Sequence, residues 1–136
     1  MLGPTLATMA GGPTWDALLA RCRGEGITVC RGRLDGWRGL WAPDHRQIWI
    51  DSRLCDQHAA PVLAHELTHV RRGDDGPQSR AVEEWIDERV ATMYVDPMAY
   101  ARAERYRGPY AACIADELDL PQWVIEAWQR RLQRAA

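Results

Sequence analysis

The chain has 136 residues, enough for one domain with a substantial hydrophobic core. Its 46% hydrophobic and 26% charged residues are ordinary for a soluble globular protein, and no apolar run approaches the roughly 18 residues of a membrane span. All 17 Lys and Arg positions are Arg. The formal net charge of -2 argues against non-specific nucleic-acid binding over the whole surface, though not against a local basic patch.

The first half of the chain predicts a small sheet. The expected elements are a loose tail over residues 1–13, a short helix capped by Thr14 and ending at Gly24 or Gly26, and strands over 27–30, 39–41 and 47–50. The last two strands are expected to form a hairpin, because the Pro43-Asp44 pair between them is typical of a turn. Trp37, Trp41 and Trp49 are expected to pack around this hairpin.

The second half of the chain predicts helices. They are a short lead-in helix at 56–58, a helix with Pro61 in its first turn and Gly73 as its cap, a helix from Ser79 to about Asp96, and three more over 98–107, 109–118 and 122–134. The fold class is therefore α+β, a small three-stranded antiparallel-type sheet with a hairpin followed by a helical majority. We expect a single domain over residues 1–136, with 98–136 as a C-terminal helical subregion.

Four cysteines bear on the compartment. They are Cys22, Cys30, Cys55 and Cys113. No pair has C-x-x-C spacing, which disfavours a cysteine zinc knuckle. The sequence shows no charged-then-apolar signal segment at its N-terminus. We therefore expect a reduced, cytoplasmic protein with free, mostly buried thiols.

The motif that carries chemistry is Ala64-His65-Glu66-Leu67-Thr68-His69. On a helix, His65 and His69 project from one face, one turn apart, where two imidazoles can bind one Zn²⁺. Glu66 is then held beside the remaining positions of the metal and is expected to act as general base. The competing interpretation is a surface helix with two solvated histidines.

A catalytic zinc needs a third protein ligand, which the segment 81–88 can supply. Glu83 and Asp87 lie one turn apart, so we expect Glu83 as the third ligand and Asp87 as the acceptor that fixes the tautomer of one zinc histidine. Glu84 remains the alternative ligand. Glu84 and Glu88 are expected to lie about 100 degrees round the helix, toward solvent.

These residues resemble the ImmA/IrrE-like metallopeptidases, small relatives of the gluzincins. The family pattern is H-E-x-x-H followed by a helix with E-x-x-x-D/N-x-x-A-A. It corresponds here to His65, Glu66 and His69, then Glu83, Asp87, Val90 and Ala91, within about residues 38–97. The resemblance implies a phage or mobile-element protein that cleaves, or relieves, a partner transcriptional repressor in the cytoplasm.

The expected function is thus a zinc-dependent metallo-endopeptidase that acts on a protein partner. The alternative is a zinc-stabilised binding protein that sequesters a repressor without proteolysis, since the same ligands serve both. Direct DNA binding by the C-terminal helices is disfavoured, because Asp116, Glu117 and Asp119 would repel phosphate. A second hydrogen-bond donor to the oxyanion of the reaction could be Tyr94, Tyr100, Tyr106, Tyr110 or an Arg. The sequence leaves the oligomeric state open.

Overall fold

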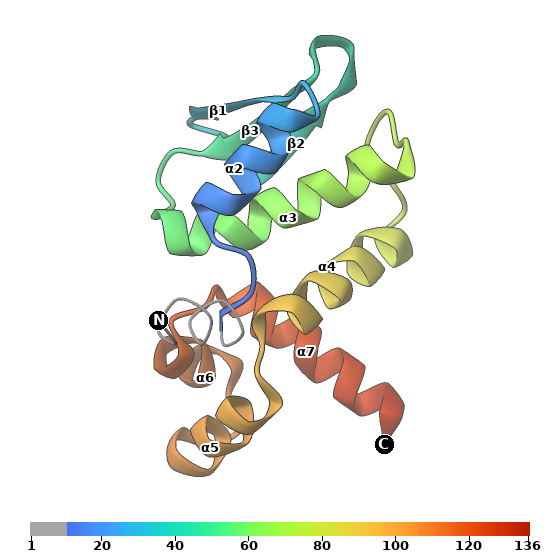
Figure 1. Cartoon of the computed structure of the whole chain (residues 1–136). Coiled ribbons are helices and arrows are strands. Elements are labelled where there is room, and N and C mark those ends of the chain that lie inside the picture. Colours follow the sequence, from blue (N-terminus) through green and yellow to red (C-terminus); the bar gives the residue numbers. More distant parts are fainter. Residues whose placement is uncertain (1–10) are drawn as a thin grey trace. The chain divides into compact units, whose positions relative to one another are not determined.

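The computed structural model describes residues 11–136 (Figure 1). The chain divides into two compact units, described separately below. The sheet unit comprises residues 14–83, and the helical unit comprises residues 84–136 together with the described residues before Thr14. The fold class is α+β, as the sequence predicts. The expectation of one domain stays a prediction, and most of the predicted tail, residues 1–10, lies outside the described residues.

The sheet unit opens with a capped helix. Helix α2 (Trp15–Gly24) begins after Thr14, whose side chain accepts a hydrogen bond from the Ala17 amide at 3.1 Å, as predicted. Leu18 and Cys22 are buried on its inner face. Burial raises the pKa of the Cys22 thiol to about 11, which keeps this thiol protonated at neutral pH.

The sheet is mixed, with strand order β1-β3-β2. Strands β2 (Gly39–Ala42) and β3 (Gln47–Asp51) form the predicted antiparallel hairpin around the short 3-10 turn η1 (Pro43–His45). Strand β1 (Thr28–Gly32) pairs in parallel with β3, so the antiparallel expectation fails for this strand. After β1 the chain reverses direction and forms β2 at the opposite edge of the sheet. Strand β3 then lies between the two and pairs with both.

Helix α3 (Asp56–Arg72) packs against β2, β3 and α2 (Figure 1). It is one continuous helix, so the separate lead-in helix at 56–58 and the first-turn position of Pro61 are both wrong. Cys55 stands at its N-cap, and Pro61 lies within the helix. Gly73 closes the C-terminus with a φ of 77°, the left-handed conformation predicted for it. Ile48 and Ile50 of β3 are fully buried in this unit.

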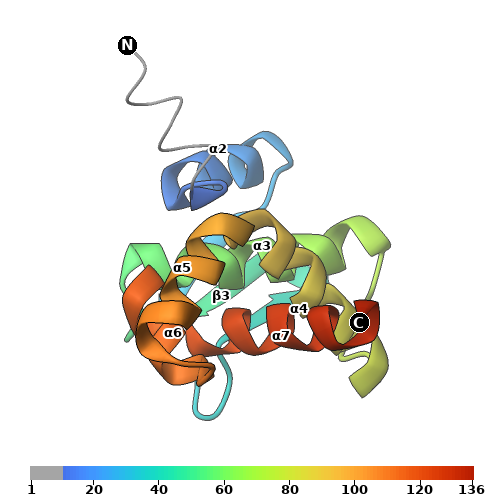
Figure 2. The same cartoon turned by 90° about the horizontal axis from the view of Figure 1, so that it is seen from below.

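The helical unit contains four helices within the described residues. They are α4 (Arg80–Tyr94), whose first turn belongs to the sheet unit, α5 (Pro97–Arg107), α6 (Ala111–Leu118) and α7 (Gln122–Ala135). Helix α6 packs against both α5 and α7 (Figure 2). Tyr94 donates a hydrogen bond to the Pro13 carbonyl at 2.6 Å, so the last residue of the predicted tail is attached to α4.

Glu88 corrects the prediction that this side chain faces solvent. Its residue is buried, and its carboxylate accepts hydrogen bonds from Arg130 and Arg134 of α7. The hydrogen bonds from Arg134, followed by those from Arg130, lower the pKa of Glu88 despite its burial. Its partners lie more than 40 residues further along the chain, so helix periodicity could not reveal them.

Three further findings bear on the sequence expectations. No helix within residues 11–136 is long and apolar enough to span a membrane. All four cysteines are free thiols, but only Cys22 is buried, and Cys55 is exposed. Trp37 is 60% exposed, so it does not pack around the hairpin as expected.

Candidate metal centre

Three predicted ligands converge in the sheet unit. Oε1 of Glu83 lies 3.0 Å from Nε2 of His65 and 3.1 Å from Nε2 of His69. One ligand atom from each of the three residues lies within 4.8 Å of the other two, and the group could hold a metal ion. Glu84, the alternative ligand, does not belong to this group.

Helix α3 positions both histidines. They lie one turn apart on its buried face, and their ring centroids are 5.0 Å apart. Both side chains are less than a tenth exposed, which removes the competing interpretation of two solvated surface histidines. Because α3 is continuous and packed against β2 and β3, the spacing of the two rings is set by a rigid element.

A short loop brings Glu83 to the histidines. Ser79 accepts a hydrogen bond from the Val82 amide at 3.3 Å and so begins α4, as predicted. The Gln78 amide donates to Oε2 of Glu83 at 3.1 Å, which leaves Oε1 directed at the two rings. Burial would raise the pKa of Glu83, but the Gln78 amide and the nearby histidines outweigh it and lower this pKa. Glu83 is thereby kept as a carboxylate, the form that can bind a cation.

His69 has a carboxylate partner that the sequence analysis did not name. Nδ1 of His69 lies 2.9 Å from Oδ2 of Asp74, a residue directly after the Gly73 cap. Asp87, the predicted acceptor, belongs to the helical unit, so its role toward a zinc histidine stays a prediction. Asp74 was missed because its contact depends on the turn of the chain at Gly73, and helix periodicity does not extend past that turn.

Glu66 is buried beside the three ligands. Burial raises the pKa of its carboxyl group, while His65 and His69 act in the opposite direction. The net shift of this pKa is upward, because the effect of burial outweighs that of the two histidines. Gly39 of β2 lies against this side chain: a Cβ at Gly39 would stand 2.7 Å from Cγ1 of Val62 and 3.2 Å from Cγ and Oε2 of Glu66.

We therefore expect Gly39→Ala to disturb the site through sterics alone. The added methyl group must push Val62 or Glu66 aside, at a cost of about 1–3 kcal/mol in the free energy of unfolding. Thermal unfolding measures this cost. Gly76→Ala is the matched control, because a Cβ at Gly76 meets nothing within 4 Å. Equal stability of the two variants would show that β2 does not hold Glu66 in place.

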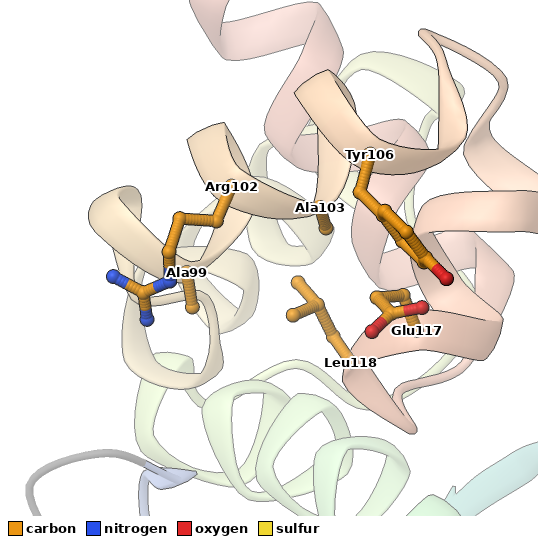
Figure 3. A pocket seen from close by; sticks show the side chains of 6 residues that line it. All are labelled: Ala99, Arg102, Ala103, Tyr106, Glu117 and Leu118. Atoms are coloured by element: carbon orange, nitrogen blue, oxygen red, sulfur yellow. The ribbon is translucent and has the colours of Figure 1, made fainter.

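A hollow in the helical unit offers no comparable chemistry. It has a volume of about 520 Å³ and is lined by Ala99, Arg102, Ala103, Tyr106, Glu117 and Leu118. Figure 3 shows Leu118 and the Tyr106 ring beside the hollow, with the Glu117 carboxylate between them. Arg107 donates to Glu117 at 3.2 Å, so the acid near this hollow is paired. Within the described residues, the three convergent ligands are the stronger site.

The donor set, the buried carboxylate of Glu66 and the acceptor Asp74 together form a candidate metal centre. Gly39, Asp74 and Gln78 belong to it in addition to the predicted residues. Searches against known protein families and against curated proteins found no match to this chain.

Proposed function

We propose that this protein is a zinc-dependent metallo-endopeptidase. The convergence of His65, His69 and Glu83 on one point carries the proposal, because two imidazoles and one carboxylate are a ligand set of catalytic zinc. Three protein ligands leave the fourth position of a tetrahedral site for water or substrate. Glu66, next to the first ligand in sequence, supplies the base.

The observed distances fit a zinc ion. Zinc binds imidazole nitrogen and carboxylate oxygen at about 2.0–2.2 Å, so two tetrahedral ligands stand about 3.3 Å apart. The two nitrogen–oxygen distances in the site are 3.0 and 3.1 Å. All three ligand atoms lie within 4.8 Å of one another, so side-chain rotations can bring His65, His69 and Glu83 around one ion.

The chemistry then divides between the ion and the chain. Bound Zn²⁺ would lower the pKa of a water molecule to about 7 and polarise the substrate carbonyl. Glu66 would take the proton that this water loses on attack and pass it to the leaving amine. Its burial beside the three ligands suits both transfers, because the group must hold the proton between the two steps. Hydrolysis requires Glu66, whereas holding the ion does not.

The proposed substrate is a protein partner, a transcriptional repressor in a phage or mobile-element setting. This assignment is supported by the sequence resemblance to ImmA/IrrE-like metallopeptidases. The proposed setting is the cytoplasm, which agrees with four free cysteines. The second oxyanion donor stays open among the four tyrosines and the arginines.

The test is metal-dependent cleavage of a repressor encoded beside this protein. We expect zinc-loaded protein to cut that repressor at one or a few peptide bonds, and chelation to stop the cutting. Mass spectrometry of the products identifies the bonds, and zinc restored after chelation should restore the activity. Stable binding of the repressor with no cleavage under either condition would contradict the peptidase and favour sequestration.

A further inference from the structure

The carboxylate of Asp74 contacts His69 of the proposed zinc site and is itself held by several hydrogen bonds. The inference from this contact rests on the proposed function. Oδ2 of Asp74 lies 2.9 Å from Nδ1 of His69, while Nε2 of the same ring faces Glu83. In a neutral imidazole, a proton donated from Nδ1 to Asp74 leaves the lone pair on Nε2. That lone pair is the one that points toward the other ligands.

Asp74 is itself held from three directions. Its carboxylate accepts from Nε of Arg72 at 2.8 Å, and its amide donates to the His69 carbonyl at 3.1 Å. Its carbonyl accepts from the indole Nε1 of Trp41 at 3.0 Å, which ties the loop after α3 to strand β2. The Asp74 side chain is only 10% exposed, so water competes little for its oxygens. The carboxylate therefore has a fixed place from which to orient the ring.

The same loop also reaches the third ligand. Gln78, four residues after Asp74, donates its amide to Glu83. The loop thus contacts His69 at one end and Glu83 at the other, and Trp41 attaches it to the sheet. A displacement of the loop would disturb two of the three ligands together.

We propose that Asp74, braced by Trp41 and Arg72, is the positioning residue that fixes the tautomer and orientation of His69 for metal binding. It acts through His69 and does not touch the ion. Carboxylates in this relation to a metal-binding histidine typically contribute 10–100-fold in metal affinity. The inference concerns how tightly the site binds its ion, so metal affinity tests it without any substrate.

The experiment measures zinc affinity by competition with a chelating dye for wild type, Asp74→Ala and Asp75→Ala. We expect Asp74→Ala to lower the affinity about 10–100-fold. Asp75→Ala is the matched control: it removes the same charge from the next position, where the side chain is exposed, and should stay within about twofold of wild type. Asp74→Asn retains an acceptor oxygen without the charge and should recover part of the loss.

Proton NMR of zinc-loaded protein detects the ring Nδ1–H of His69 directly. This signal would not change if Asp74 only stabilised the fold. Wild type should show a protected ring Nδ1–H signal for His69, and Asp74→Ala should lose it. If Asp74→Ala does not fold, the affinity of Asp74→Asn decides instead. Wild-type affinity in the folded variant would overturn the positioning role while leaving the zinc site intact. A wild-type protein that binds no zinc would overturn the proposed function, and this inference with it.

Discussion

Replacing Glu66 by glutamine is expected to lower the rate of peptide cleavage by about 10²–10⁴-fold while the protein keeps its zinc. Glutamine has nearly the same shape, but its amide cannot take up the proton that the attacking water loses. The ligand atoms of His65, His69 and Glu83 are untouched by the change. Cleavage kinetics and zinc content by mass spectrometry, measured on the same preparation, separate the two effects.

The fold should survive this substitution. Only 7% of Glu66 is exposed, and this burial already raises the pKa of its carboxyl group. A neutral side chain therefore suits the environment. Glu104→Gln, at an exposed position on α5, is the matched control and should cleave at the wild-type rate. An undiminished rate in Glu66→Gln would rule out Glu66 as the base. No cleavage by the wild type, with repressor binding equal in both proteins, would favour sequestration.

Local periodicity accounts for the part of the site that the sequence predicts. His65 and His69 share a face because they lie one turn apart on α3, and Glu83 follows the Ser79 cap by a fixed number of helical residues. Each of these relations is contained within one helix or its first turn. Glu83 reaches the histidines only because the loop between α3 and α4 folds back. Helix periodicity does not predict this fold-back; it was expected because a catalytic zinc needs a third protein ligand.

The features that the sequence did not reveal depend on contacts between distant segments. Trp41 in β2 donates a hydrogen bond to Asp74, which lies 33 residues further along the chain in the irregular loop after α3. Gly39 matters only because β2 runs directly against α3, and the parallel pairing of β1 with β3 depends on the path of the link between β1 and β2. One signal was present: an aspartate directly after a glycine helix cap, five residues beyond a predicted histidine ligand.

Removing either histidine of the proposed zinc site is expected to abolish both metal binding and the stability that metal confers. A ligand that binds only the folded state stabilises it by about 2.7 kcal/mol at a concentration of 100 times its dissociation constant. Wild type should therefore unfold at a higher temperature when zinc is added. His65→Ala and His69→Ala should show no such shift, because two remaining protein ligands hold the ion too weakly. Differential scanning calorimetry with and without zinc measures the shift.

The two variants should also differ from each other before any zinc is added. His69→Ala leaves the carboxylate of Asp74 with Arg72 but without the ring that it contacts, so part of the loop loses an anchor. His45→Ala, an exposed histidine in η1, is the matched control and should retain the full zinc-dependent shift. A shift of wild-type size in His65→Ala or His69→Ala would place the ion elsewhere. Hydrolysis by this site would then have no basis, because Glu66 would no longer lie beside the metal.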